Sequence, residues 1–189
     1  MFADQRANYS VNRAWADKMT PHVNRIVGPY LLETTPDQVD MKEGSDLWVI
    51  GGRDKRIAVR VRRAGYAERY PFDFTVRSAV PSGATTELEK LVNGFGDWMF
   101  YGHASVDENS ISHWMLIDLA AWRAHLIRWA LKRKNPNDRL WTAQSNDDGT
   151  KFAAFDVRNF VGPPAILIAS SAYESNKRQH DILDLGADA

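Results

Sequence analysis

The chain has 189 residues, of which 44% are hydrophobic and 25% are charged, and its formal net charge at pH 7 is zero. This length and balance are typical of one folded domain with its own core, and the zero net charge argues against a protein that coats nucleic acid indiscriminately. The absence of cysteine excludes disulfides and thiolate metal sites. No apolar run is long enough to span a bilayer and the first ten residues lack the apolar core of a signal peptide, so we expect a cytoplasmic protein without a membrane partner.

The first half of the chain predicts a helix followed by strands. Residues 11–27 carry apolar side chains at helical spacing, and Thr20-Pro21 would either kink this helix or divide it in two. Residues 47–50 and 57–62 have the pattern of strands, and the turn chemistry between them predicts an antiparallel hairpin. A third strand is predicted over residues 72–77, because polar and apolar side chains alternate there.

The second half mixes helices and strands. Thr86 and Glu89 have the spacing of a capping box, and residues 120–134 form the strongest helical pattern of the chain. Strands are expected over residues 98–101, 113–119, 152–157 and 165–169, and a turn at 147–149. This order predicts an α/β or α+β domain, in which a mixed sheet with an antiparallel hairpin-led core is flanked by helices. We expect one domain over residues 1–173 and a polar C-terminal tail over 174–189.

The polar side chains of the first three predicted strands share one face. Asp46 opens the first strand, Arg60 and Arg62 lie on the second, Thr75 and Arg77 lie on the third, and Glu87 begins the following helix. Carboxylates hold a hard divalent cation through oxygen, and arginine grips a phosphate with two hydrogen bonds. Acids and bases gathered in this way are what metal-dependent phosphodiester chemistry requires.

These residues resemble the PD-(D/E)XK nuclease superfamily. The resemblance covers residues 15–102 and consists of a helix, the segment Gly44-Ser45-Asp46-Leu47, a hairpin and the segment Ala58-Val59-Arg60-Val61-Arg62. Asp46 matches the first acid of the motif and Arg60 stands where the family has lysine, but Ala58 stands where the second acid should be. The resemblance implies a restriction-endonuclease-like fold and a magnesium-dependent nuclease.

Each candidate residue then has an expected role. Asp46, Arg60 and Glu87 would be catalytic; Asp46 and Glu87 would hold Mg²⁺ with an upstream acid, for which the candidates are Glu33, Asp40 and Glu43; and Arg62, Arg77, Arg53 and Arg63 would bind nucleic acid. The alternative is a catalytically inactive nuclease-fold protein that binds nucleic acid or a protein partner, and a homodimer is compatible with both. For the acid and base cluster, a structural network of ion pairs is the competing interpretation.

Aromatic residues and one histidine near this cluster are further candidates. Trp98, Phe100 and Tyr101 are the aromatic residues best placed to stack on bases, whereas the tryptophans of helical stripes fit a core. His103 follows in a predicted turn and is either a site residue or a structural one.

Overall fold

The computed structural model describes residues 2–34, 47–49, 55–135 and 137–172 of the chain. They fall into two compact units. The smaller unit contains residues 1–54 with 109–111, and the larger unit contains residues 55–108 with 112–189. The predicted tail, residues 174–189, lies outside the described residues.

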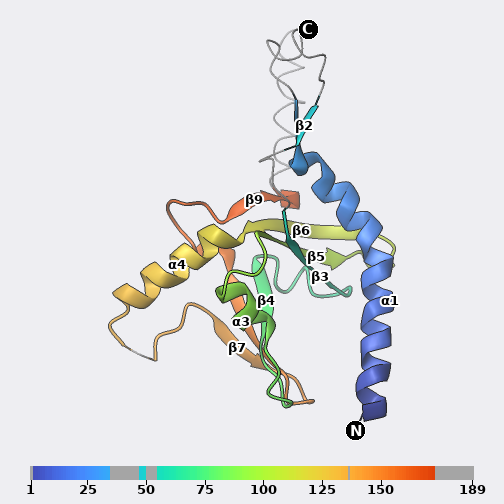
Figure 1. The fold of residues 1–189 in the computed structure, drawn as a ribbon, viewed down its shortest axis with the longest axis horizontal. Coiled ribbons are helices and arrows are strands. Elements are labelled where there is room, and N and C mark those ends of the chain that lie inside the picture. Colours follow the sequence, from blue (N-terminus) through green and yellow to red (C-terminus); the bar gives the residue numbers. More distant parts are fainter. Residues whose placement is uncertain (1, 35–46, 50–54, 136, 173–189) are drawn as a thin grey trace. The chain divides into compact units, whose positions relative to one another are not determined.

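The smaller unit is built on one long helix, α1 (Phe2–Val27), followed by a 3-10 turn, η1 (Gly28–Leu31) (Figure 1). The helix continues through Pro21, so of the two predicted alternatives the structure contains one helix and not two. Strand β1 (Leu32–Thr34) then pairs antiparallel with β2 (Leu47–Val49). A proline inside a helix removes one backbone donor. The Thr20 hydroxyl, which donates to the Ala16 carbonyl at 2.7 Å, adds a hydrogen bond in the preceding turn.

A four-stranded sheet forms one half of the larger unit. Its order is β3 (Ile57–Arg62), β5 (Trp98–Ala104), β6 (Ile111–Asp118) and β9 (Leu167–Ser170). Strand β3 runs parallel to β5, whereas β9 runs antiparallel to β6, so the sheet is mixed. Every residue of β5 is buried, as expected of a central strand covered on both faces.

A three-stranded antiparallel sheet forms the other half. Its order is β4 (Asp73–Ala79), β8 (Lys151–Asp156) and β7 (Thr142–Ser145). Figure 1 shows its strands running across the direction of the four-stranded sheet. The predicted turn at residues 147–149 is confirmed as the tip of the β7–β8 hairpin, where Gly149 has a φ of +78°.

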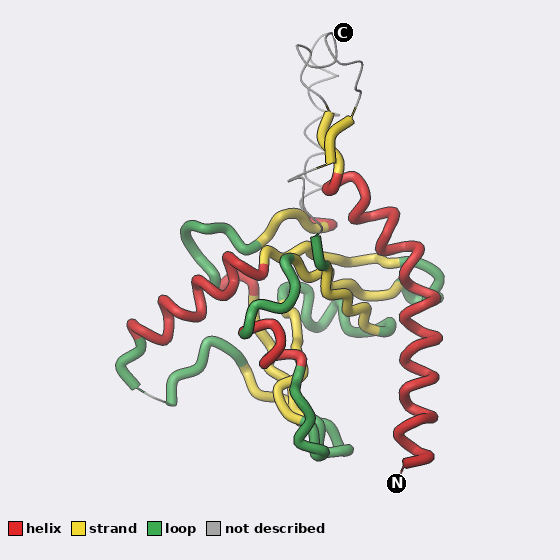
Figure 2. The backbone as a smooth tube through the Cα atoms, viewed as in Figure 1, coloured by secondary structure: helices red, strands yellow, loops and turns green. Residues whose placement is uncertain are grey.

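Helices α3 and α4 also belong to the larger unit. Helix α3 (Glu87–Val92) begins at Thr86, and the predicted capping box is confirmed: the Thr86 hydroxyl accepts from the Glu89 N–H, and the Glu89 carboxylate accepts from the Thr86 N–H. Helix α4 (Leu119–Lys132) begins directly after β6, as Figure 2 shows. A single 3-10 turn, η2 (Val157–Asn159), follows β8. The described elements therefore form a mixed α+β structure.

The predicted hairpin between residues 47–50 and 57–62 is wrong. Strand β2 pairs with β1, and β3 pairs with β5. Strand β4 belongs to the three-stranded sheet, where it pairs with β8. Alternation along a strand predicts its two faces but not its partner. The real partner of β3 arrives only after β4 and α3, because parallel strands need a long connection.

In strand β3, the face that was predicted to carry the polar side chains is the one that lies toward the core. Ala58 packs against the core cluster and Arg60 is half-buried, whereas Val59 is 51% exposed. Strand β4 follows the predicted pattern, since Phe74 and Val76 are fully buried. The core that holds both sheets together is built on large side chains from several elements, among them Phe74, Tyr101, Trp122 and Phe155.

Candidate functional site

Two residues of the predicted acid and base cluster, Arg60 and Glu87, form an ion pair in the structure. The Arg60 Nη1 atom lies 2.7 Å from the Glu87 Oε2 atom, and the same carboxylate oxygen accepts the Arg77 backbone N–H at 3.0 Å. The two side chains of the ion pair are only 18% and 29% exposed. Glu87 therefore joins helix α3 to strands β3 and β4, which is a structural task.

Arg60 is held by an aromatic ring as well as by Glu87. Its guanidinium lies 5.0 Å from the centre of the Phe152 ring, which belongs to β8 of the other sheet. Burial lowers the pKa of Arg60, and the Glu87 carboxylate acts in the opposite direction. Arginine remains charged despite such a shift. The buried charge thus stabilises the junction between the two sheets through one ion pair and one cation–π contact.

Several of the other predicted site residues are described only in part or not at all. Arg63 forms an ion pair with Glu108 at 3.0 Å. Glu33 lies in β1, opposite Trp48, and its side chain lies outside the described residues, as do the whole of Asp40, Glu43, Asp46 and Arg53. Within the described part of the chain, no three His, Asp or Glu side chains gather closely enough to hold a metal ion.

A different surface of the larger unit combines arginines with exposed aromatic rings. The guanidinium of Arg62 lies 4.5 Å from the Tyr66 ring centre, that of Arg69 lies 5.2 Å from Tyr70, and that of Arg158 lies 4.3 Å from Phe72. The three rings are 43%, 37% and 42% exposed, respectively. We call these six residues the Arg–aromatic surface. Exposed aromatic rings beside fixed cations are a platform on which flat, anionic ligands bind.

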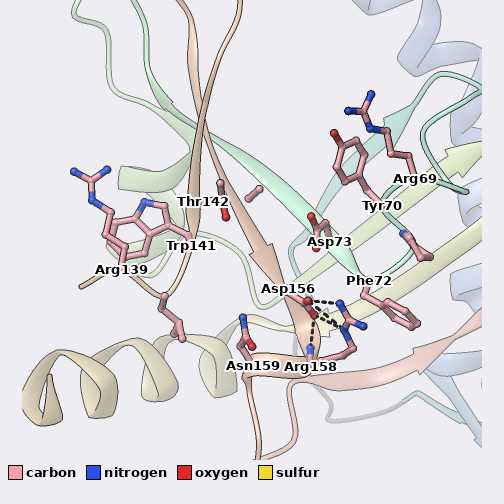
Figure 3. Close-up of a pocket in the computed structure, with 13 residues that line it drawn as sticks. Arg69, Tyr70, Phe72, Asp73, Arg139, Trp141, Thr142, Asp156, Arg158 and Asn159 are labelled. Carbon is pink, nitrogen blue, oxygen red and sulfur yellow. Dashed lines mark hydrogen bonds and ion pairs between the residues drawn. The ribbon is translucent and has the colours of Figure 1, made fainter. Parts of the chain in front are cut away.

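A polar cavity of about 380 Å³ opens on this surface between β4, β7 and β8 (Figure 3). Figure 3 shows Arg69 and Tyr70 on one side of it and Arg139 and Trp141 on the other. Thr142 and Asn159 add hydrogen-bonding groups. The cavity therefore presents cations, aromatic rings and neutral polar groups to the same ligand.

Two carboxylates meet in this cavity. Asp73 of β4 and Asp156 of β8 are directly opposite each other in the antiparallel ladder. Burial raises the pKa of Asp73, and the neighbouring Asp156 charge raises it further. The pKa of Asp156 is lowered instead, because the Arg158 guanidinium donates to both of its oxygens, at 2.9 and 2.6 Å. Two equivalent side chains thus have unequal proton affinities, set by one arginine.

A second, smaller cavity of about 180 Å³ shares Tyr70, Asp73 and Ala154 with the first. It lies between the two sheets, and Arg62 and Tyr66 line it. The Thr75 and Tyr101 hydroxyls also line it and form a hydrogen bond to each other at 3.1 Å.

His103 is the least expected residue of the smaller cavity. It lies in β5, not in a turn, and only 2% of it is exposed. Neither ring nitrogen has a hydrogen-bond partner in the structure. Burial, followed by the charges of His113 and Arg62, lowers the pKa of His103 to about 4, so the imidazole is neutral at pH 7.

The aromatic residues predicted to stack on bases are core residues instead. Trp98, Phe100 and Tyr101 are 8%, 0% and 2% exposed, because β5 is covered on both faces. The Arg–aromatic surface was not predicted, although the sequence contains a pattern that indicates it. Between Arg62 and Phe72, arginines and aromatic residues alternate through a loop, and loops commonly carry binding residues.

Comparison of the chain with models of known families, with characterised proteins and with solved structures gives no match. The described helices include none with the length and apolar character needed to cross a bilayer.

Proposed function

We propose that the chain binds nucleic acid through the Arg–aromatic surface. The observation that supports this proposal is that three exposed aromatic rings each lie beside an arginine, and that the six residues line two cavities that share Tyr70. Base stacking on aromatic side chains contributes about 1–3 kcal/mol per base, and arginine adds phosphate contacts and cation–π interactions. The planar guanidinium also stacks on bases directly.

The charges around the larger cavity favour an anionic ligand. Three arginines line it: Arg69, Arg139 and Arg158. It also contains two acids, Asp73 and Asp156, and Asp156 forms an ion pair with Arg158. A formally neutral chain therefore carries a local excess of positive charge at the Arg–aromatic surface. Local charge of this kind steers a polyanion toward one face of a protein.

The test is fluorescence anisotropy with labelled 20-mers of single-stranded DNA, RNA and duplex DNA at several salt concentrations. We expect binding that weakens as salt rises, and a double variant Arg69→Gln/Tyr70→Ala that binds at least about tenfold more weakly. The matched control is Lys90→Gln, which removes one positive charge from an exposed position on α3 and should bind as the wild type does. Equal binding by the double variant would reject the surface, and absence of binding to all three polymers would redirect the search to a protein partner.

Metal-dependent cleavage is a second candidate, because Asp73 and Asp156 lie opposite each other beside this surface. Mg²⁺ is often held by one or two carboxylates together with substrate phosphates. The PD-(D/E)XK resemblance proposes Asp46 and Glu87 instead, and Glu87, like Asp156, already has an arginine partner in the structure. The restriction-endonuclease-like architecture remains part of this second proposal, and the mixed four-stranded sheet is compatible with it.

Cleavage is tested on plasmid, single-stranded DNA and RNA with Mg²⁺ or Mn²⁺ and with EDTA controls. Loss of activity in Asp46→Ala alone would support the site that the resemblance implies, whereas loss in Asp73→Asn alone would support the carboxylate pair. No cleavage by a folded wild-type protein would leave binding without catalysis.

We also propose a cytoplasmic location, which the absence of cysteine favours. A homodimer stays a proposal, and multi-angle light scattering of the full chain tests it.

A further inference from the structure

We infer that the smaller cavity receives one unstacked base of a single-stranded nucleic acid, inserted between the two sheets. This inference rests on the proposed nucleic-acid binding and gives it a substrate class. The cavity shares Arg62, Tyr66 and Tyr70 with the Arg–aromatic surface and adds His103, Gln144 and Asn146 to it.

The size of the cavity suits a single base. Pockets for drug-sized ligands measure about 300–1,000 Å³, whereas this one measures about 180 Å³. A heterocyclic base fits into such a space, but its sugar and phosphate would remain outside. The neighbouring cavity of about 380 Å³, which shares Tyr70 and Asp73, offers room for them.

The chemistry of the cavity points to a ring that both donates and accepts hydrogen bonds. A neutral imidazole has one donor and one acceptor nitrogen. Both nitrogens of His103 lack a partner, although the side chain is 98% buried, as follows from its 2% exposure. Buried polar groups are nearly always hydrogen-bonded, and both nitrogens are shielded from water, so a ligand would bind one of them by displacing the side chains that cover it. The edges of nucleobases carry donors and acceptors side by side.

The more exposed residues that line the cavity also suit a nucleobase. Arg62 stacks on Tyr66, and both line the cavity together with the exposed Gln144 and Asn146 of the β7–β8 hairpin. Arg62 and His103 are paired in the parallel register of β3 and β5, so their side chains lie on the same face of the sheet. A base that reaches His103 therefore passes a flat cation and an aromatic ring.

The surroundings favour a single strand over a duplex. Inserting a base from a duplex costs unpairing and unstacking, whereas single strands expose their bases at little cost. The arginines of the larger cavity, Arg69 and Arg158, lie where the adjoining backbone would continue. The Asp73 carboxylate, which also lines the smaller cavity, disfavours a free phosphate there.

The test compares four labelled probes of equal length: a single strand, the same strand in duplex, an all-abasic strand, and a strand with a single abasic site moved along its length. We expect the single strand to bind at least about tenfold more tightly than both the duplex and the all-abasic strand. Proton–nitrogen spectra of histidine-labelled protein should show the His103 ring signals shifting with the single strand and not with the abasic one.

Two variants locate the effect. His103→Phe removes both ring nitrogens and adds bulk to the cavity wall. Gln144→Leu changes a cavity residue that is exposed, so we expect the fold to be unaffected. Each should weaken binding of the single strand about tenfold and leave binding of the abasic strand unchanged. If the His103 signals stay still and His103→Phe binds the single strand as the wild type does, the cavity inference is wrong while the proposed function stands. If no polymer binds at all, both are wrong.

Discussion

Arg60 of β3 and Glu87 of α3 form a 2.7 Å ion pair that also receives the Arg77 backbone N–H of β4. One carboxylate therefore connects elements of two different sheets. Because both side chains are largely shielded from water, either charge becomes costly when its partner is removed.

Replacement of Glu87 should consequently change stability. We expect Glu87→Ala to lower the free energy of unfolding by about 1–3 kcal/mol, since Arg60 and the Arg77 N–H both lose their acceptor. Glu87→Gln should cost less, because the amide oxygen still accepts. Urea unfolding followed by circular dichroism measures both, and an unchanged midpoint in Glu87→Ala would contradict a structural role.

Burial of His103 predicts a loss of stability in mild acid. Its pKa in the folded state is about 4, below its ordinary value of 6.5, so the unfolded chain takes up a proton first as the pH falls. Stability should decrease from pH 6.5 to pH 4 by up to about 3 kcal/mol, at roughly 1.36 kcal/mol per pKa unit. His103→Gln should flatten this dependence between those pH values in urea titrations, whereas His22→Gln, on α1, should preserve it.

The raised pKa of Asp73 predicts that replacing this residue stabilises the protein. Its pKa is raised in the fold, by burial and then by Asp156, so the charged form that prevails at pH 7 is disfavoured there. Asp73→Asn should therefore raise the melting temperature at pH 7. The gain should vanish in strong acid, where the carboxyl is protonated in both states. A lower melting temperature at pH 7 would show that the carboxylate is better solvated than the structure indicates.

The capping box of α3 predicts a local effect. Thr86→Ala removes the side-chain acceptor for the Glu89 N–H and should destabilise the protein by about 1 kcal/mol. Thr85→Ala, one residue earlier at an exposed position, provides the matched control and should be neutral. Thermal unfolding of the two variants measures the difference, and equal melting temperatures would contradict the importance of the cap.

Local patterns predicted most elements but not their partners. The capping box, α4 and the turn at residues 147–149 depend on residues close in sequence, and all three are present in the structure. Strand β3 shows the limit: its alternation is correct, yet it pairs with β5 and exposes Val59. Pairing is decided by the whole core, which no short segment contains.

The candidate site shows the same limit. Arg60, Arg77 and Glu87 were predicted to share one face of a single sheet, whereas they meet where β3 and β4, which belong to different sheets, contact α3. The cavities were not predicted, since they bring the loop after β3 together with β7, β8 and η2, about seventy residues later. Asp73 and Asp156 meet only through the register of β4 and β8, and neither belongs to a recognisable motif.

The separation of β4 from β8 in the chain has a consequence during synthesis. Asp73 and Arg69 leave the ribosome long before Asp156 and Arg158, and until those arrive β4 has no neighbour in its sheet. The Arg–aromatic surface is therefore incomplete in a nascent chain until β8 and Arg158 have emerged. Nearly the whole described chain must be synthesised before the surface that we propose as a nucleic-acid site is complete.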